Sequence, residues 1–179
     1  DWPGADVIIG NPPFLGSKFM RKGRPANKKN PAILGLGDDY VNKLFQAYAG
    51  APPASANFVS YWFQKSLRHL EGAKTQRIGL VATQSIRFGA SNKPIAEAVR
   101  ADQAEIFLAQ QNDEWTIDGA EVRVAIFCLR KPASAVSDCI LDGKVVVRIH
   151  PDLTSGSSLF EAHPLSENAD LAFQGVKMN

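Results

Sequence analysis

The segment best suited to chemistry is an asparagine followed by two prolines and a phenylalanine, Asn11 to Phe14. Proline fixes its own φ angle, has no N–H group and pushes the preceding residue toward an extended backbone. Because Asn11 precedes Pro12 and Pro12 precedes Pro13, two consecutive residues are stiffened and two backbone donors are lost. The Asn11 side-chain oxygen and the Pro12 carbonyl can then both accept hydrogen bonds from one –NH₂ group. Phe14 adds a flat face on which a planar ring can stack.

This set of groups suits methyl transfer to an amine. An exocyclic amino group on a nucleobase is a poor nucleophile, because its lone pair is delocalised into the ring. Two acceptors that hold its hydrogens favour a pyramidal nitrogen, whose lone pair can attack an electrophilic methyl group in line. Catalysis then comes from positioning and electrostatic complementarity to the transition state, without a metal or a covalent intermediate. The alternative is a Pro-Pro turn that only ends a strand.

Alternating strands and helices are predicted to position this segment. Residues 5–10, ADVIIG, form a short apolar run ended by Gly10, which predicts a buried parallel strand. The Asn11–Phe14 segment follows at once, at the carboxyl end of a strand, where open α/β sheets bind ligands. Apolar spacing predicts one helix that begins at Asp38 and Asp39 and a stronger helix over residues 57–73, whose aromatic side chains we expect in the core.

Two further pairs of elements follow. Residues 77–83 predict a second buried strand, followed by a turn at 84–89 and a helix near 91–101. In that turn, Gln84 and Ser85 either line the same pocket or serve ordinary turn chemistry. Strands are predicted at 104–110 and 121–131, and the short connection between them favours an antiparallel pair.

The composition and the apolar pattern of the sequence change after Pro132. Residues 139–150 contain two β-rich runs across Asp142-Gly143, a strong hairpin signal, and the remainder is loop-rich. We therefore predict a domain boundary near residue 133.

Positive charge is concentrated close to the Asn11–Phe14 segment. Residues 1–75 hold ten Lys or Arg against five acids, and the remainder hold ten against thirteen. A Gly/Pro/Asn-rich loop without any acid contains Lys18, Arg21, Lys22, Arg24, Lys28 and Lys29. The loop is either a mobile solvated segment or a phosphate-contacting loop at a nucleic-acid site, where clustered cations gain affinity by releasing counterions.

The overall composition is that of a globular domain. The chain has 179 residues, of which 45% are hydrophobic and 21% charged, enough to bury a core. No run approaches the roughly 18 apolar residues of a membrane helix, and the start lacks the features of a signal peptide. We therefore expect a soluble, cytoplasmic protein without membrane contact. Cys128 and Cys139 have no metal-ligand spacing, and we expect two unrelated thiols.

Several segments of the sequence resemble those of a known enzyme family. Asn-Pro-Pro-Phe after DVIIG looks like motif IV of amino-methylating, S-adenosylmethionine-dependent DNA methyltransferases. The wider pattern GNPPFLGSK, NFVSYWFQK, IGLVATQSI and WTIDGAEVRVAIF is similar to large restriction-modification fusion enzymes of the MmeI type, over roughly residues 5–131. The resemblance implies S-adenosylmethionine as cofactor, with Asn11 beside it, and double-stranded DNA as partner. It also implies transfer to N6 of an adenine flipped out of the duplex, held by Asn11 and Pro12 and stacked on Phe14.

The family pattern also includes a glycine-rich F-x-G-x-G loop and an acidic residue that holds the cofactor ribose, and neither occurs in this sequence. We therefore expect the C-terminal half of a Rossmann-like class I methyltransferase, with a mixed sheet whose last strand is antiparallel. Residues 1–132 would be a partial catalytic domain, and residues 133–179 the start of a β-rich target-recognition domain or a linker. The first strand would be an exposed edge. Self-association would be one way to cover it, and we expect the fragment alone to be inactive.

Two other functions fit the same residues. Protein glutamine methyltransferases use a similar Asn-Pro-Pro-aromatic motif on a side-chain amide, and a DNA-binding module with an inactive methyltransferase half would keep the fold without the chemistry. The basic loop favours DNA over protein as the substrate.

Overall fold

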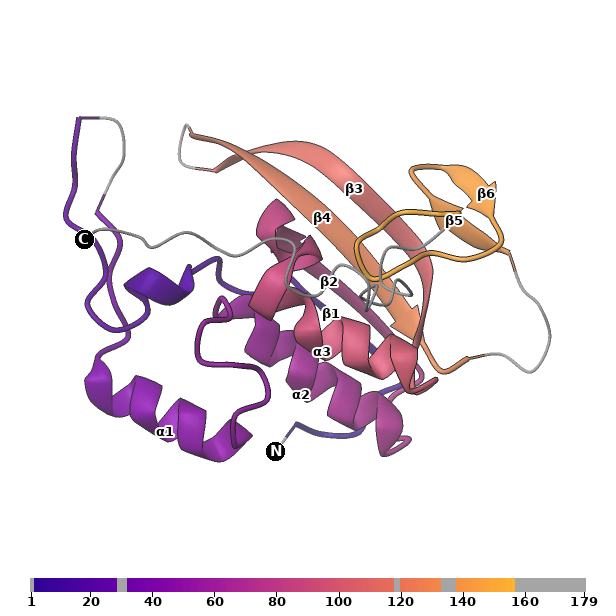
Figure 1. The fold of residues 1–179 in the computed structure, drawn as a ribbon, viewed down its shortest axis with the longest axis horizontal. Coiled ribbons are helices and arrows are strands. Elements are labelled where there is room, and N and C mark those ends of the chain that lie inside the picture. The colour runs from indigo at the N-terminus through magenta and orange to yellow at the C-terminus, as the bar shows by residue number, and fades with distance from the viewer. Residues whose placement is uncertain (1, 29–31, 118–119, 133–137, 157–179) are drawn as a thin grey trace, which may run out of the picture.

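The computed structural model describes residues 2–28, 32–117, 120–132 and 138–156, which form a mixed α/β fold. The strands are β1 (Val7–Gly10), β2 (Arg77–Thr83), β3 (Glu105–Ile117), β4 (Ala120–Arg130), β5 (Cys139–Leu141) and β6 (Lys144–Val146). The helices are α1 (Asp38–Tyr48), α2 (Val59–Glu71) and α3 (Gly89–Arg100), with short 3-10 helices η1 (Ser17–Phe19) and η2 (Gln84–Arg87). The helices α2 and α3 lie against one face of a six-stranded sheet, whereas α1 lies to one side of it (Figure 1).

The strand order is β1-β2-β4-β3-β5-β6. β1 and β2 are parallel, whereas β4 runs antiparallel to both of its neighbours, β2 and β3. The predicted antiparallel pairing of β3 with β4 is therefore confirmed. Since β4 is inserted between β2 and β3, the sheet is mixed, and the carboxyl ends of β1, β2 and β3 point to the same edge.

The main core lies between the sheet and the helices α2 and α3. Alternate residues of β2 are buried on the helix side, namely Ile78, Leu80 and Ala82, while Gly79 and Val81 on the opposite face are only half-buried. In α2, Phe63 is fully buried and meets Phe127 of β4 edge-on, with ring centroids 5.5 Å apart. The expectation that the helix aromatics belong to the core is confirmed for Phe63 and Tyr61, and Trp62 is half-buried.

A second, smaller core joins α1 to the N-terminal end of α2. Its buried residues are Leu15, Met20, Val41, Phe58 and Tyr61. Leu15 and Met20 lie in the segment between β1 and α1. This cluster therefore anchors the chain that follows the Asn11–Phe14 segment.

The prediction that the first strand is buried is wrong. Ile9 is 83% exposed and Val7 is 47% exposed. β1 is the end strand of the sheet, with β2 as its neighbour, and Ile9 lies beside Gly79 on the half-buried face of β2. The strand itself and its parallel pairing agree with the prediction, and its predicted position at an exposed edge of the sheet is confirmed.

The predicted connection between the third and fourth strands is also wrong. β3 continues to Ile117 and β4 begins at Ala120, so residues read as a loop extend a two-stranded ribbon beyond the end of β2. Irregular pairing near Ile106 and Gln110 adjusts the register. Cross-strand pairs such as Trp115 with Val122 supply the β-forming contacts, which depend on the partner strand.

The predicted hairpin at Asp142-Gly143 is confirmed, since both residues have positive φ and join β5 to β6. The hairpin continues the same sheet, because β5 pairs in parallel with β3. After β6, Ile149 and Leu153 are buried in the main core. The division of the chain near residue 133 stays a prediction.

No helix in the described ranges is long and apolar enough to cross a membrane. Cys128 and Cys139 are both free thiols, and burial raises the pKa of each.

Candidate active site

The Asn11–Phe14 segment leaves the carboxyl end of β1 and lies at the surface. Asn11 and Pro13 are exposed, Phe14 is half-buried and Pro12 is buried. Within the described part of the chain, the Asn11 side chain has no hydrogen-bond partner. The amide is therefore available to an external donor, while the buried Pro12 ring holds its neighbours in place.

Two hydrogen bonds fasten the residues after Phe14 to the start of α2. The Phe58 N–H donates to the Leu15 carbonyl over 2.9 Å, and the Ser17 N–H donates to the Asn57 side-chain oxygen over 3.0 Å. The Leu15 side chain is also buried in the second core, with an exposed fraction of 8%. The segment is thus held by β1 at its beginning, and by the two hydrogen bonds and the buried Leu15 side chain at its end.

The turn after β2 contains the two polar residues that the sequence placed near the same pocket. Ser85 is exposed, and its Oγ accepts a hydrogen bond of 2.8 Å from the Asn57 Nδ2. Gln84 instead donates to the Gln111 carbonyl and to the Asn112 side chain of β3. The structure therefore links Ser85 to the Asn11–Phe14 side of the sheet edge, and Gln84 to the β3–β4 ribbon.

Contacts of the same turn with the C-terminal segment were not predicted. The Arg87 Nε donates to the Asp152 carbonyl over 2.7 Å, and its Nη1 donates to the Gln84 Oε1 over 3.1 Å. The buried Asn92 amide donates to the carbonyls of Ile86 and Pro151. No local sequence signal could have identified the Arg87–Asp152 and Asn92–Pro151 pairs, because their partners lie 65 and 59 residues apart.

The described residues of the predicted basic loop form two limbs that lead from η1 to α1, which we call the basic arm (residues 18–28 and 32–36). Its limbs are joined by paired backbone hydrogen bonds between Arg24 and Ile33 and by a bond from the Leu36 N–H to the Met20 carbonyl. Gly23 has φ +68°, and a Cβ there would overlap the Ile33 carbonyl oxygen. Glycine is required at this position because the limbs approach closely. Figure 1 shows the arm projecting from the body of the fold.

The cations of the arm have different surroundings. Lys18, Lys22 and Lys28 are exposed, whereas Lys29 lies outside the described residues. The Arg24 guanidinium lies over the Phe19 ring, 5.6 Å from its centroid.

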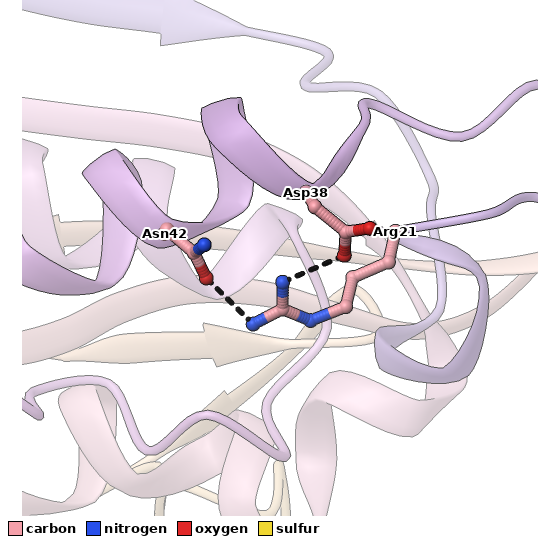
Figure 2. Close-up of polar contacts among 3 residues, drawn as sticks. All are labelled: Arg21, Asp38 and Asn42. Atoms are coloured by element: carbon pink, nitrogen blue, oxygen red, sulfur yellow. Dashed lines mark hydrogen bonds and ion pairs between the residues drawn. The ribbon is translucent and has the colours of Figure 1, made fainter.

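Arg21 is held by α1 (Figure 2). Its Nη1 forms an ion pair of 2.8 Å with Asp38, and its Nη2 donates to the Asn42 Oδ1 over 2.9 Å. The guanidinium also lies 5.6 Å from the centroid of the Phe45 ring. The described contacts of Arg21 therefore dock the arm on α1, and a phosphate contact by Arg21 stays a prediction that would compete with Asp38.

Trp115 and His69 lie outside this site. Trp115 is half-buried in the β3–β4 ribbon, beyond the end of β2. His69 is buried on α2, next to the Trp2 ring, and burial followed by the charges of Lys74 and Lys65 lowers its pKa. Neither residue is hydrogen-bonded to the Asn11–Phe14 segment.

The donor set of this site fits a methyl donor in part. An exposed amide at the end of a strand can lie between a methyl donor and a target amine, but the chain contains no F-x-G-x-G loop and no acidic residue ending a preceding strand. The described residues therefore account for the target side of the site and for no contact with the ribose or base of a methyl donor.

Two comparisons with known proteins found matches to this chain. A family model described as the MmeI DNA-methyltransferase domain matches residues 5–140. The solved structure of the Type IIL restriction-modification enzyme MmeI in complex with DNA is 19% identical, with a TM-score of 0.62, over 86% of this chain and 20% of that chain. The chain thus spans about one fifth of the length of that enzyme. The six-stranded mixed sheet is consistent with a methyltransferase-like fold. No curated protein sequence matches the chain.

Proposed function

The chain belongs to the MmeI DNA-methyltransferase domain family, and from this premise we propose that it handles the target base in a restriction-modification DNA methyltransferase. The proposed reaction transfers a methyl group to the exocyclic N6 amino group of an adenine flipped out of double-stranded DNA. The observation that carries the proposal is the exposed Asn11 amide, which is followed by two prolines at the carboxyl end of a parallel strand.

The residues of the chain act by holding the target. Asn11 Oδ1 and the Pro12 carbonyl accept the two amino hydrogens, which favours the pyramidal nitrogen with its lone pair free to react. The Phe14 ring stacks on the extruded base and replaces part of the stacking lost from the duplex. S-adenosylmethionine supplies an electrophilic methyl group when bound. The prolines and the anchors at Leu15 and Ser17 keep the acceptors in place before the substrate arrives.

The basic arm provides the proposed contact with the DNA backbone. It begins four residues after Phe14 and carries the exposed ammonium groups of Lys18, Lys22 and Lys28. Lys29, Arg21 and Arg24 are further candidates. Such contacts add affinity without sequence selectivity.

We further propose that the chain acts as the C-terminal half of a Rossmann-like class I catalytic domain. The glycine-rich cofactor loop would come from another part of the intact protein, and residues 133–179 would lead into target recognition. The exposed β1 edge, with Ile9 83% exposed, supports a neighbouring element at that position. By this proposal the fragment alone is inactive. Self-association through β1 is an alternative way to cover the exposed edge of the sheet.

Replacement of the two target-holding residues tests the proposal. In the intact protein, Asn11→Ala should lower kcat for DNA methylation by about 10²–10³-fold, the usual effect of losing a positioned polar group. Phe14→Ala should also lower kcat, because it removes the ring on which the extruded base stacks. Duplex affinity should change by less than about threefold, because the phosphate contacts remain. The matched control is Gln103→Ala, which removes an exposed amide that is bonded to Glu71 at the opposite end of the sheet.

The substrate assay separates this function from the alternatives. Methyl incorporation into duplex DNA at adenine N6 is the expected outcome. Incorporation into a glutamine-containing protein instead of DNA would identify a protein methyltransferase. DNA binding without methyl transfer by the wild-type protein, or full activity of Asn11→Ala, would contradict the proposal.

A further inference from the structure

We propose that Asn57 is a positioning residue that ties the chain just after the Asn11–Phe14 segment, at Ser17, to the turn after β2 and thereby fixes the spacing of these two loops beside the candidate site. This inference rests on the proposed function, because it assigns Asn57 a role in the same site. Asn57 precedes α2 and touches neither of the two acceptors assigned to the target amine.

Both ends of the Asn57 side-chain amide are used. Its Oδ1 accepts from the Ser17 N–H over 3.0 Å, and its Nδ2 donates to the Ser85 Oγ over 2.8 Å. Ser17 lies three residues after Phe14, and Ser85 lies in the turn after β2. A primary amide combines an acceptor and a donor on one planar group, so it can bridge two loops that each offer one partner.

The backbone around Asn57 is itself held. The Asn57 N–H donates to the Ser91 Oγ over 3.0 Å, and the following Phe58 N–H donates to the Leu15 carbonyl. The hydroxyl of the fully buried Ser60 donates to the Ser91 carbonyl, which ties α2 to α3. The amide is therefore presented from a fixed backbone and can transmit position from one loop to the other.

The bridge begins where the regular pairing stops. The β1–β2 ladder ends with Gly10 opposite Leu80, whereas β2 continues to Thr83. The Asn11–Phe14 segment and the 84–88 turn thus leave the sheet as separate loops. Ser85 is in turn paired with Thr83 through their hydroxyls, which are 2.9 Å apart. The chain of contacts from Ser17 through Asn57 and Ser85 to Thr83 replaces the missing ladder at the edge where the target base would enter.

This placement has a catalytic consequence. An acceptor pair that is misplaced by about 1 Å can cost about 10²-fold in rate, because in-line attack depends on the position of the nitrogen. Loss of the bridge should therefore reduce kcat more than it reduces DNA binding. A residue that only stabilised the fold would lower the amount of active protein without this separation.

The test uses the intact methyltransferase with four variants. Asn57→Ala removes both hydrogen bonds and should lower kcat by about 10–100-fold, with KM for DNA within about threefold. Asn57→Asp should restore at least a third of wild-type kcat, because a carboxylate accepts from the Ser17 N–H and from a reoriented Ser85 hydroxyl. Ser85→Ala removes one side of the bridge and should show an intermediate loss. Gln103→Ala is the matched control and should keep wild-type kcat.

Hydrogen exchange supplies a readout that does not depend on turnover. The Ser17 amide should exchange at least tenfold faster in Asn57→Ala than in the wild type, while exchange in β2 and α3 is unchanged. If Asn57→Ala does not fold, the kcat of Ser85→Ala and Asn57→Asp tests the bridge. Ser85→Ala should lose kcat while Asn57→Asp keeps at least a third of it, and wild-type kcat in Ser85→Ala would refute the bridge.

The same experiments distinguish failure of the Asn57 bridge from failure of the proposed function. If Asn11→Ala is inactive but Asn57→Ala or Ser85→Ala keeps wild-type kcat and Ser17 exchange, the bridge is refuted and the proposed function stands. If Asn57→Asp is as slow as Asn57→Ala, the bridge is refuted as well. If Asn11→Ala is fully active, the proposed function itself fails.

Discussion

An exposed polar side chain in this fold can bind an external partner, whereas a buried ionisable side chain is restricted to its neutral form. Asn11 is exposed, and its side chain has no partner among the described residues, so its polarity is available for a substrate. His69 is 7% exposed, and its Nδ1 has no hydrogen-bond partner within the described part of the chain. Burial, and then the charges of Lys74 and Lys65, lower the His69 pKa from its ordinary value of 6.5. The neutral ring is therefore the form that the fold accepts.

This state of His69 predicts a loss of stability in acid. Below pH 6.5 the unfolded chain binds a proton at this residue that the folded chain excludes. The free energy of unfolding should then fall as the pH is lowered, by at most about 1.4 kcal/mol per pH unit from this group. Urea denaturation between pH 7.5 and 5.5 measures the effect, and His69→Phe should have a shallower dependence. Equal slopes for the two proteins would show that His69 does not contribute.

The basic arm combines a fixed base with exposed charges. The backbone bonds between Arg24 and Ile33 close the limbs, and Arg21 docks the arm on α1 through Asp38. The Arg21–Asp38 pair is exposed, and such pairs typically contribute about 0–1 kcal/mol, so the second core must supply most of the docking energy. The lysines remain at the surface of this element.

The arm lysines should determine the salt dependence of DNA binding. Changing Lys18, Lys22 and Lys28 together to alanine should reduce the slope of log K against log salt by about 2.7, since each phosphate contact contributes about 0.9. Titrations of duplex DNA over a range of salt concentrations measure the slope. Alanine at Lys74, Lys93 and Lys144, which are exposed on other elements, is the matched control. An unchanged slope in the arm variant would exclude these phosphate contacts.

In the whole molecule, the segment after β6 is part of the main core. Leu153 is fully buried and Ile149 is 1% exposed, in the same cluster as α3 and the sheet. The Arg87 bond to the Asp152 carbonyl joins this segment to the turn beside the candidate site. Residues that follow the hairpin therefore contribute to the packing of the turn after β2.

Leu153→Ala should accordingly destabilise the entire fold. Removal of a fully buried leucine side chain costs about 2–5 kcal/mol, through lost burial and the remaining cavity. Val147→Ala serves as the control, since Val147 is 84% exposed, and its effect should stay within about 0.5 kcal/mol. Chemical denaturation of both variants provides the comparison. Equal stability of the two would mean that the segment is not integral to the core.

Local patterns in the sequence determined the elements that depend on neighbouring residues. The bounds of β2, the helices α1 and α2 and the Asp142-Gly143 hairpin follow from apolar spacing and turn chemistry, which act within a few residues. The Asn11–Phe14 segment was identified in the same way, because the effect of proline on the backbone is local.

Tertiary structure decided the features that depend on distant partners. The insertion of β4 between β2 and β3, the exposure of Ile9 and the burial of Leu153 follow from which elements become neighbours. The role of Asn57 became visible only when Ser17 and Ser85 were brought to its two ends, 40 and 28 residues away. Hydrogen bonds and burial depend on distance in space, and one sequence records only distance along the chain.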